Sequence, residues 1–353
     1  MVFKKIKLTL TLVVCFFFFT CGNEKEKKSY SSLKATNLSV TFEKIKGISF
    51  VSPNFLLEQS HFTPIQELGA NWVSNMPFGM IKKGSAEVRF NLEWQWASEK
   101  EEGVLKAVKA AKEKGLKVML KPQLWGHDIF TGTFGFEKDK DWQSFENDYL
   151  DFILFYAKIA ADSKVDMYCI GTELARFVKA RPKFWEKLIE EVKKVYNGKL
   201  TYAENWDAVE VFPFWNLLDF IGSDAYYPIS DKKYPSVSDF IEGWEPWKQK
   251  LKQFSKELNK PILFTEWGYR STVYNGLKPW DYSENLEVSQ KNQLNAYTAV
   301  FETLYNEDWF AGGFLWKWFP YPNSGGPTND RFTPQNKLAE EKLRSFFKKS
   351  VNQ

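Results

Sequence analysis

Two glutamates stand at positions where a carboxylate can do chemistry. Glu173 follows the apolar run 168–171 almost directly, and Glu266 ends the run 262–265; both runs are typical of buried parallel strands. A carboxylate at the carboxyl end of such a strand suits catalysis if the strands form a (β/α)8 barrel, because active sites lie at that face. Two carboxylates on one rim, about 5–5.5 Å apart, are what hydrolysis of a glycoside with retention requires. The alternative is that each glutamate is a strand-end member of an ion pair.

The rest of the chain alternates between strand and helix patterns. This alternation predicts a parallel sheet with right-handed crossovers, and a count of eight strands favours a closed TIM barrel in a single domain over an open sheet. Strands are predicted at 46–51, 71–76, 116–122, 166–172, 199–203, 220–226, 261–265 and 312–318, and helices at 63–68, 101–114, 145–161, 182–196, 244–258, 286–305 and 338–347.

The predicted order places the two glutamates on one rim. Glu173 follows the fourth strand and Glu266 follows the seventh, 93 residues later, so the two face each other across the mouth of a ring of eight. Long loops at 75–96 and 125–142 carry Trp and Phe, which favours a shaped cleft over disorder. No Gly-rich phosphate loop is present, which disfavours a nucleotide-binding fold.

The first residues form a leader. Lys4, Lys5 and Lys7 precede the apolar stretch 8–19, which is too short to span a bilayer and is typical of a signal peptide. Cys21 follows at once and resembles the lipidation site of a bacterial lipoprotein, although an ordinary cleaved signal is the alternative. We therefore predict a signal peptide at 1–20, a lipid-anchor cysteine and flexible linker at 21–43, and the catalytic barrel at 44–350, exported and anchored to a bacterial membrane.

Charge, cysteine and histidine content limit which binding partners and bound groups this chain is expected to have. Removing residues 1–20 takes away three lysines and no acidic residue, which lowers the formal net charge from +4 to +1. Nucleic-acid binding then has no electrostatic basis. Only Cys21 and Cys169 would remain, so no disulfide forms within one chain if Cys21 is lipidated. The two histidines, His61 and His127, lack the spacing of metal ligands, so no metal and no cofactor are expected. We expect a monomer.

Several segments resemble a known family. Glutamates ending the fourth and seventh strands are similar to those of glycoside hydrolase clan A, and family 113, the endo-β-1,4-mannanases, is the closer resemblance. It covers residues 45 to 347 and rests on Lys46-Gly47-Ile48-Ser49, Lys121-Pro122-Gln123-Leu124-Trp125, Gly171-Thr172-Glu173, Asp224-Ala225-Tyr226-Tyr227-Pro228, Phe264-Thr265-Glu266-Trp267-Gly268-Tyr269 and Trp316-Lys317-Trp318. The resemblance implies a retaining mechanism on β-mannan, with Glu173 as acid/base and Glu266 as nucleophile. Much of clan A has Asn before the acid/base, whereas this chain has Thr172, which puts the contact to the sugar 2-hydroxyl in doubt.

Position within the predicted strands suggests supporting residues. Either Tyr226 or Tyr227 is expected to donate to Glu266. Trp316 is predicted to lie under the sugar at the cleaved bond, with a core Trp as the alternative. A lysine in a barrel mouth is costly to bury alone, so Lys121 either binds sugar hydroxyls or pairs with a carboxylate.

Five further residues complete the predicted substrate contacts. Gln123 shares a strand face with Lys121. His127 is a hydroxyl contact or a structural loop residue. Asn205 and Trp206 end the fifth strand and are predicted to line the cleft, and Asp224 either binds sugar or orients a neighbour.

Three rival functions remain open. In the first, the substrate is another β-glycan, such as a glucan or xylan, or a mannoside cleaved from one end. In the second, the chain is a tethered glycan-binding protein without catalysis. In the third, it is a structural lipoprotein unrelated to sugar. The presence of both glutamates favours the hydrolase.

Overall fold

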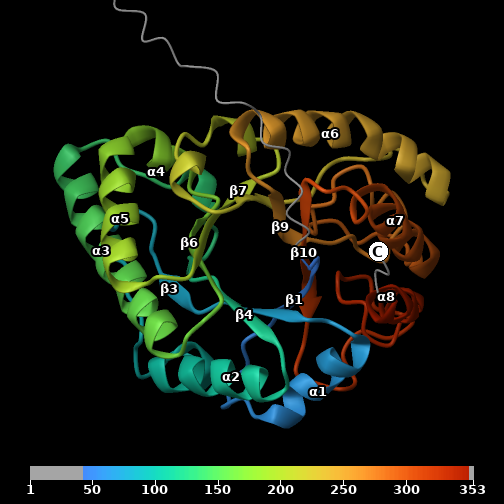
Figure 1. The fold of residues 1–353 in the computed structure, drawn as a ribbon, viewed down its shortest axis with the longest axis horizontal. Coiled ribbons are helices and arrows are strands. Elements are labelled where there is room, and N and C mark those ends of the chain that lie inside the picture. The colour runs from blue at the N-terminus through green and yellow to red at the C-terminus, as the bar shows by residue number, and fades with distance from the viewer. Residues whose placement is uncertain (1–42, 350–353) are drawn as a thin grey trace, which may run out of the picture. The chain divides into compact units, whose positions relative to one another are not determined.

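Eight parallel strands close into a barrel. The computed structural model describes residues 43–349, and Figure 1 shows the strands as a central ring with the helices outside it. The strands follow one another around the barrel in the order β1-β2-β4-β6-β7-β8-β9-β10, and β10 pairs with β1 to close it. Their bounds are β1 Ile45–Phe50, β2 Trp72–Asn75, β4 Lys117–Leu120, β6 Met167–Thr172, β7 Lys199–Asn205, β8 Ile221–Asp224, β9 Ile262–Trp267 and β10 Phe310–Trp318. The predicted TIM barrel is confirmed.

Helices fill six of the seven crossovers between barrel strands, and α8 follows β10; the chain between β7 and β8 has only short 3-10 turns. The predicted pattern also left that crossover without a helix. The helices are α1 Gln59–Leu68, α2 Glu101–Glu113, α3 Asp139–Asp162, α4 Ala175–Ala180, α5 Pro182–Val195, α6 Val237–Leu258, α7 Gln290–Leu304 and α8 Leu338–Lys348; the 3-10 turns are η1 Ala97–Glu99, η2 Thr131–Thr133, η3 Val209–Val211 and η4 Trp215–Leu217.

The predicted first residues of several helices differ from those in the structure. The helices α3 and α6 begin six and seven residues before the predicted starts at 145 and 244, and α7 begins four residues after the predicted start at 286. Ser236 caps α6 in a capping box: its hydroxyl accepts from the Asp239 N–H at 3.1 Å, while Asp239 Oδ2 accepts from the Ser236 N–H at 2.8 Å. The first turn of α3 is mostly polar, so its apolar period appears only later.

A second, two-stranded parallel sheet stands beyond the barrel strands. The chain after β2 forms β3 (Phe78–Met80), and the chain after β4 forms β5 (Gln123–Trp125); both were predicted to be loop or strand end. Pro122 separates β4 from β5, and because proline has no N–H it cannot donate to the ladder there. Pairing resumes with the Gln123 N–H donating to the Pro77 carbonyl at 3.0 Å. This sheet raises one wall at the mouth of the barrel.

Two apolar layers hold the barrel. One lies between strands and helices and contains most of the buried aromatic rings. The other fills the barrel interior below the mouth and consists of Ile45, Trp72, Met119, Met167, Cys169, Ala203, Leu263, Ala311 and Phe314. Gly47 makes room for Phe314 in this layer, since a Cβ on Gly47 would lie 2.4 Å from the Phe314 ring.

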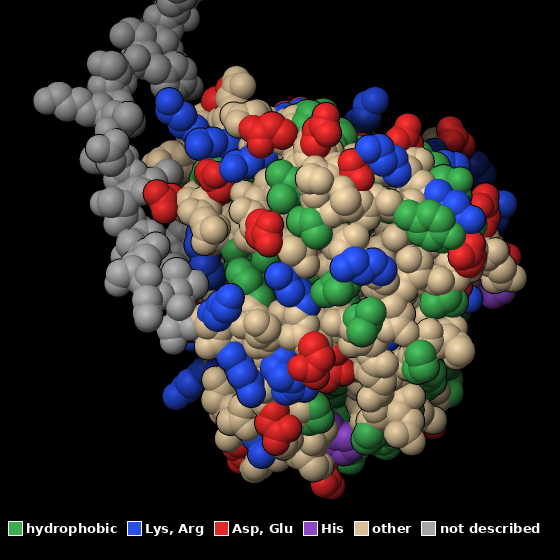
Figure 2. Space-filling view, turned by 90° about the vertical axis from the view of Figure 1, so that its right-hand side faces the viewer, with side chains coloured by type: hydrophobic (Ala, Val, Ile, Leu, Met, Phe, Trp, Pro, Cys, Tyr) green, Lys and Arg blue, Asp and Glu red, His purple; other side chains and the backbone are tan. Residues whose placement is uncertain are grey.

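The outer surface mixes charges of both signs. On the flank that Figure 2 presents, lysine and arginine side chains alternate with acidic ones rather than gathering by sign. Within residues 43–349, no helix combines the length and the apolar character needed to cross a bilayer. The predicted signal peptide, linker and Cys21 lie outside the described residues.

The capping box of α6 gives a stability test. Ser236→Ala removes the acceptor for the Asp239 N–H and should lower the melting temperature by about 1–3 °C. The matched control is Ser238→Ala in the same turn, whose hydroxyl bonds to the Ser236 hydroxyl and to no backbone group of the described chain. Thermal unfolding followed by circular dichroism measures both; equal shifts in the two variants would refute the role of the cap.

Candidate active site

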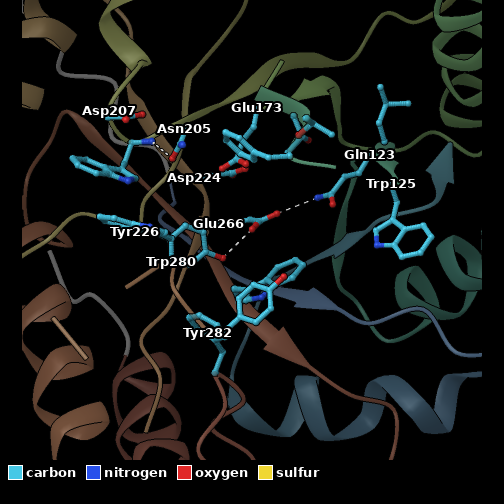
Figure 3. Close-up of a pocket in the computed structure, with 17 residues that line it drawn as sticks. Gln123, Trp125, Glu173, Asn205, Asp207, Asp224, Tyr226, Glu266, Trp280 and Tyr282 are labelled. Atoms are coloured by element: carbon cyan, nitrogen blue, oxygen red, sulfur yellow. Dashed lines mark hydrogen bonds between the residues drawn. The ribbon is translucent and has the colours of Figure 1, made fainter. Parts of the chain in front are cut away.

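A cavity of about 640 Å³ opens at the carboxyl ends of the strands. Figure 3 shows Glu266 in the middle of it, with Gln123 and Trp125 on one side and Tyr226 and Trp280 on the other. Every barrel strand from β6 to β10, together with β5, contributes lining residues directly or through the loop that follows. The lining consists of Gln123, Leu124, Trp125, Phe130, Thr131, Thr172, Glu173, Asn205, Trp206, Asp207, Asp224, Tyr226, Glu266, Trp280, Tyr282, Trp316 and Phe332.

Three donors hold the Glu266 carboxylate at the floor of the cavity. Oε1 accepts from Lys121 Nζ at 2.5 Å and from Gln123 Nε2 at 3.0 Å, while Oε2 accepts from the Tyr226 hydroxyl at 2.9 Å. The side chain is buried, with 7% of the residue exposed. Donors on both oxygens stabilise the negative charge and fix the direction in which the carboxylate points.

Lys121 lies beneath the cavity, without any exposed surface, and bridges two carboxylates. Its Nζ also donates to Asp224 at 3.1 and 3.3 Å. Burial alone would lower the pKa of Lys121, but attraction to Asp224 and Glu266 outweighs burial and raises it above the ordinary lysine value. The lysine is therefore charged, and it pairs with carboxylates, which was one of the two alternatives for this residue.

Asp224 is the second partner of Lys121. Its Oδ1 also accepts from Thr265 Oγ1 at 2.7 Å. Burial and the charge of Glu266 raise the pKa of Asp224 to about 7, with Lys121 and Thr265 acting in the opposite direction. Both oxygens of Asp224 face protein donors, so this carboxylate orients Lys121.

Glu173 follows β6 in an unusual backbone conformation. Its φ is +51°, a left-handed value that is uncommon for residues other than glycine and occurs often at functional sites. The Glu173 N–H still donates to the Ala203 carbonyl at 2.8 Å, so pairing with β7 continues through this residue. Burial, then the negative charges of Asp224 and Glu266, raise the pKa of Glu173 well above its ordinary value. Glu173 and Glu266 thus share one cavity, and the charge of Glu266 is one cause of the raised pKa of Glu173.

Glu204 is a third strand-end glutamate that the sequence analysis missed. It lies next to the last residue of β7, is 1% exposed, and accepts from the Asn205 N–H at 2.9 Å. Burial and then the charge of Asp224 raise the pKa of Glu204 to about 8. The same signal that singled out Glu173 and Glu266, a carboxylate closing a short apolar run, is present at 200–204.

Aromatic rings form the walls. Trp206 after β7 stacks on Trp280, with ring centroids 5.2 Å apart and the planes tilted by 23°. Trp280 and Tyr282 belong to the segment 268–289 after β9, which the sequence analysis did not count among the long loops. That segment is fixed by the buried Arg270, which donates to the carbonyls of Asp281 and Glu284.

The structure brings most of the predicted site residues together. Glu173, Glu266, Gln123, Asn205, Trp206, Asp224, Tyr226 and Trp316 line the cavity, and Lys121 lies directly below it. Of the two tyrosine candidates, Tyr226 bonds to Glu266, whereas the Tyr227 hydroxyl bonds to Ser223 at 3.1 Å and its ring packs on Trp244 and Trp247.

Two predicted contacts lie elsewhere. Tyr227 is buried behind the strand and does not line the cavity, because side chains alternate between the two faces of extended backbone. His127 is also outside the lining: its side chain is exposed and pairs with the neighbouring Asp128 at 2.8 Å. Among residues 43–349, no cluster of His, Cys, Asp and Glu side chains has the arrangement of a metal site.

Comparison with solved structures finds similar barrels. A family 113 β-mannanase from Alicyclobacillus acidocaldarius, in complex with ManMIm, is 26% identical over 87% of this chain and 98% of its own, with a TM-score of 0.77. A second family 113 β-1,4-mannanase is 24% identical over 88% of this chain and all of its own, with a TM-score of 0.77. A β-D-glucuronidase of Dictyoglomus thermophilum shares 15% identity over 88% of this chain and 51% of its own, with a TM-score of 0.57.

Among curated protein sequences, none matches the chain significantly. The model of glycoside hydrolase family 113 matches residues 58–337, which is most of the chain. The likeness in sequence agrees with the likeness in fold, and it confirms the resemblance drawn from the strand-end motifs. The chain is a glycoside hydrolase and belongs to glycoside hydrolase family 113.

Proposed function

We propose that this enzyme cleaves β-1,4-mannosidic bonds in mannan or manno-oligosaccharides, by double displacement with Glu266 as nucleophile and Glu173 as acid/base. The observation that carries the proposal is the contrast between the two glutamates of one cavity. Glu266 has three donors on its oxygens, whereas the pKa of Glu173 is raised by burial and by two neighbouring carboxylates. Carboxyl groups whose environments separate their protonation states take the roles of acid and base.

The first displacement uses both groups at once. Protonated Glu173 donates its proton to the glycosidic oxygen, and the bond between this oxygen and the anomeric carbon breaks as a Glu266 oxygen bonds to that carbon. The leaving sugar departs with the proton. The products of this step are a covalent glycosyl ester on Glu266 and an ionised Glu173.

The second displacement releases the sugar. Glu173 now accepts a proton from water, and the water oxygen attacks the anomeric carbon from the side that the leaving group vacated. The ester bond to Glu266 breaks and its carboxylate is restored. Two inversions at one carbon retain the β configuration. As the ester forms, charge leaves the Glu266 carboxylate, and Lys121 remains compensated by Asp224.

Thr172 stands where much of clan A has Asn, and its surroundings support a contact to a sugar hydroxyl. Thr172 lines the cavity, and its hydroxyl is buried and has no hydrogen-bond partner among the described residues. A buried hydroxyl without a partner costs free energy, which a substrate hydroxyl would recover. Trp316 lies in the lining as the sugar platform requires, while Trp206 and Trp280 offer a stacked wall.

The choice of mannan as substrate is supported by the similar solved structures rather than by the residues of the cavity. The two most similar structures described above are β-mannanases, one of them at 26% identity. Other clan A β-glycans remain the second candidate, because the two-glutamate chemistry is indifferent to the sugar. Membership of a hydrolase family argues against the third rival, a tethered glycan-binding protein without catalysis.

Export and lipid anchoring through Cys21 are part of the proposal, and their support is the sequence of the leader alone.

A substrate panel tests the sugar. Release of reducing ends should be fastest on linear β-1,4-mannan and glucomannan and weak on β-glucan and xylan. The protein carrying Glu266→Gln, prepared in parallel, excludes a contaminating activity. Cleavage confined to glucan or xylan would replace the mannan assignment, and retention on mannan affinity gels without any cleavage would favour the binding protein.

Azide rescue tests the nucleophile. Glu266→Ala should lower turnover of an aryl β-mannoside by several orders of magnitude, as loss of a nucleophile does in other enzymes. Azide fits the vacated space and should restore part of the activity, yielding the α-mannosyl azide. Glu204→Ala is the matched control, a nearby buried glutamate at which azide should form no glycosyl azide. Near-native activity in Glu266→Ala would refute the assignment.

The pH profile tests the acid. Ionised Asp224 raises the pKa of Glu173, so Asp224→Asn should lower that pKa and move the alkaline limb of kcat/KM by about one pH unit toward acid. Asp207→Asn is the control, because Asp207 is exposed at the rim of the same cavity. An alkaline limb that stays in place in Asp224→Asn would show that another group sets it.

A further inference from the structure

A second hollow of about 380 Å³ lies between α1 and the segment that follows β10. We name it the outer hollow, and its lining includes Ser60, His61, Phe319, Tyr321, Asn336 and Glu340. Its size falls in the range of small-ligand pockets, about 300–1,000 Å³. The lining combines aromatic faces with amide, hydroxyl and carboxylate groups, which is the mixture that a pyranose with apolar faces and polar edges requires.

Aromatic rings in the outer hollow are open to solvent. Tyr321 is 51% exposed, and its ring meets Phe55 edge-on with centroids 6.0 Å apart. Phe55 in turn lies 5.2 Å from the His61 ring. Within residues 43–349, all nine strongly exposed aromatic side chains, Tyr321 among them, lie between the end of a barrel strand and the next helix. Exposed rings thus gather on the face that carries the cavity.

A lysine held between two rings links a residue of the cavity to a residue of the outer hollow. Trp316 lines the cavity and Phe319 lines the outer hollow. Lys317 Nζ lies 4.8 Å from the Trp316 ring centroid and 5.3 Å from that of Phe319, so one cation contacts both. The ammonium group has no hydrogen-bond acceptor among the described residues, which leaves its N–H groups available to sugar hydroxyls on this path.

The wall of the outer hollow is held rigidly by two amide side chains. Gln335 accepts from the Phe319 N–H at 2.7 Å and donates to the Phe319 carbonyl at 3.1 Å. Asn336 donates to the carbonyls of Pro322 and Ser324, both at 2.8 Å. The segment bearing Phe319 and Tyr321 is therefore ordered before any ligand arrives, which lowers the entropic cost of binding.

His61 supplies a directed donor. Its Nδ1 accepts from the Glu58 N–H at 3.0 Å at the start of α1, and in the tautomer that makes this bond Nε2 carries a proton. No described residue accepts from Nε2. An N–H donor beside an exposed tyrosine ring is suited to a sugar hydroxyl.

We propose that the outer hollow binds a distal sugar unit of the same glycan chain whose cleaved bond lies in the cavity, with its ring face on Tyr321 and a hydroxyl at His61 Nε2. This inference rests on the proposed function for the identity of the sugar. The chain passes from Trp316 over Lys317 and Phe319 into the outer hollow. Long chains therefore gain a contact that short chains cannot reach.

Calorimetric titration of the full chain carrying Glu266→Ala tests the proposal, because without turnover long oligosaccharides survive. Adding Tyr321→Ala should weaken binding of mannohexaose about tenfold and leave mannotriose unchanged. Tyr321→Phe keeps the ring and should bind mannohexaose as the parent does. Tyr234→Ala, a tyrosine of similar exposure on the loop before α6, is the control for an exposed ring outside the outer hollow.

The outcomes separate the two proposals. Equal losses on both oligosaccharides, or no loss on mannohexaose, would overturn the distal site while leaving the mannanase assignment intact. If the Glu266→Ala parent binds no manno-oligosaccharide, the sugar assignment fails first. The same pair of chain lengths from the cello and xylo series then decides whether Tyr321 contacts a distal unit.

Discussion

The site depends on one buried lysine shared by two carboxylates. Lys121 has no exposed surface, and its ammonium group bonds to both Asp224 and Glu266. An isolated charge at this depth would be very costly, and so would two adjacent carboxylates without a cation. The three groups are therefore stable only together. Their arrangement fixes the position of Glu266, and it leaves one negative charge in excess, which acts on the remaining carboxyl groups of the cavity.

That excess negative charge raises the pKa of Glu173 and Glu204. Both carboxyl groups are near Asp224, both lose water by burial, and the pKa of each is raised. Removal of water and repulsion by like charge act in the same direction. Of these two raised groups, only Glu173 lines the cavity, where its backbone adopts the left-handed region. Burial and charge thus both favour the protonated form of the carboxyl group that lines the cavity.

Sequence patterns predicted the barrel and most of the cavity floor, because a short apolar run closed by a carboxylate reflects the physical requirements of a barrel strand. Glu173, Glu266 and Asp224 all carry this signal. Glu204 carries it too, although it was not singled out. The rest of what the patterns missed lies where no periodicity exists. The β3–β5 sheet consists of strands too short to show alternation, and the segment bearing Trp280 precedes the helix predicted from 286 and has no periodic pattern. Tyr226 and Tyr227 differ by one position, so only the local turn of the backbone decides which hydroxyl reaches Glu266.

The buried guanidinium of Arg270 ties two loops into one body. It donates to backbone carbonyls at Asp281 and Glu284 after β9, and to the Asp330 side chain after β10 at 2.5 Å. The first loop presents Trp280 and Tyr282, and the second presents Phe332. Neither loop can be reshaped without disturbing the other. A redesign of the cavity wall should therefore change both segments together, or exchange the two as a unit.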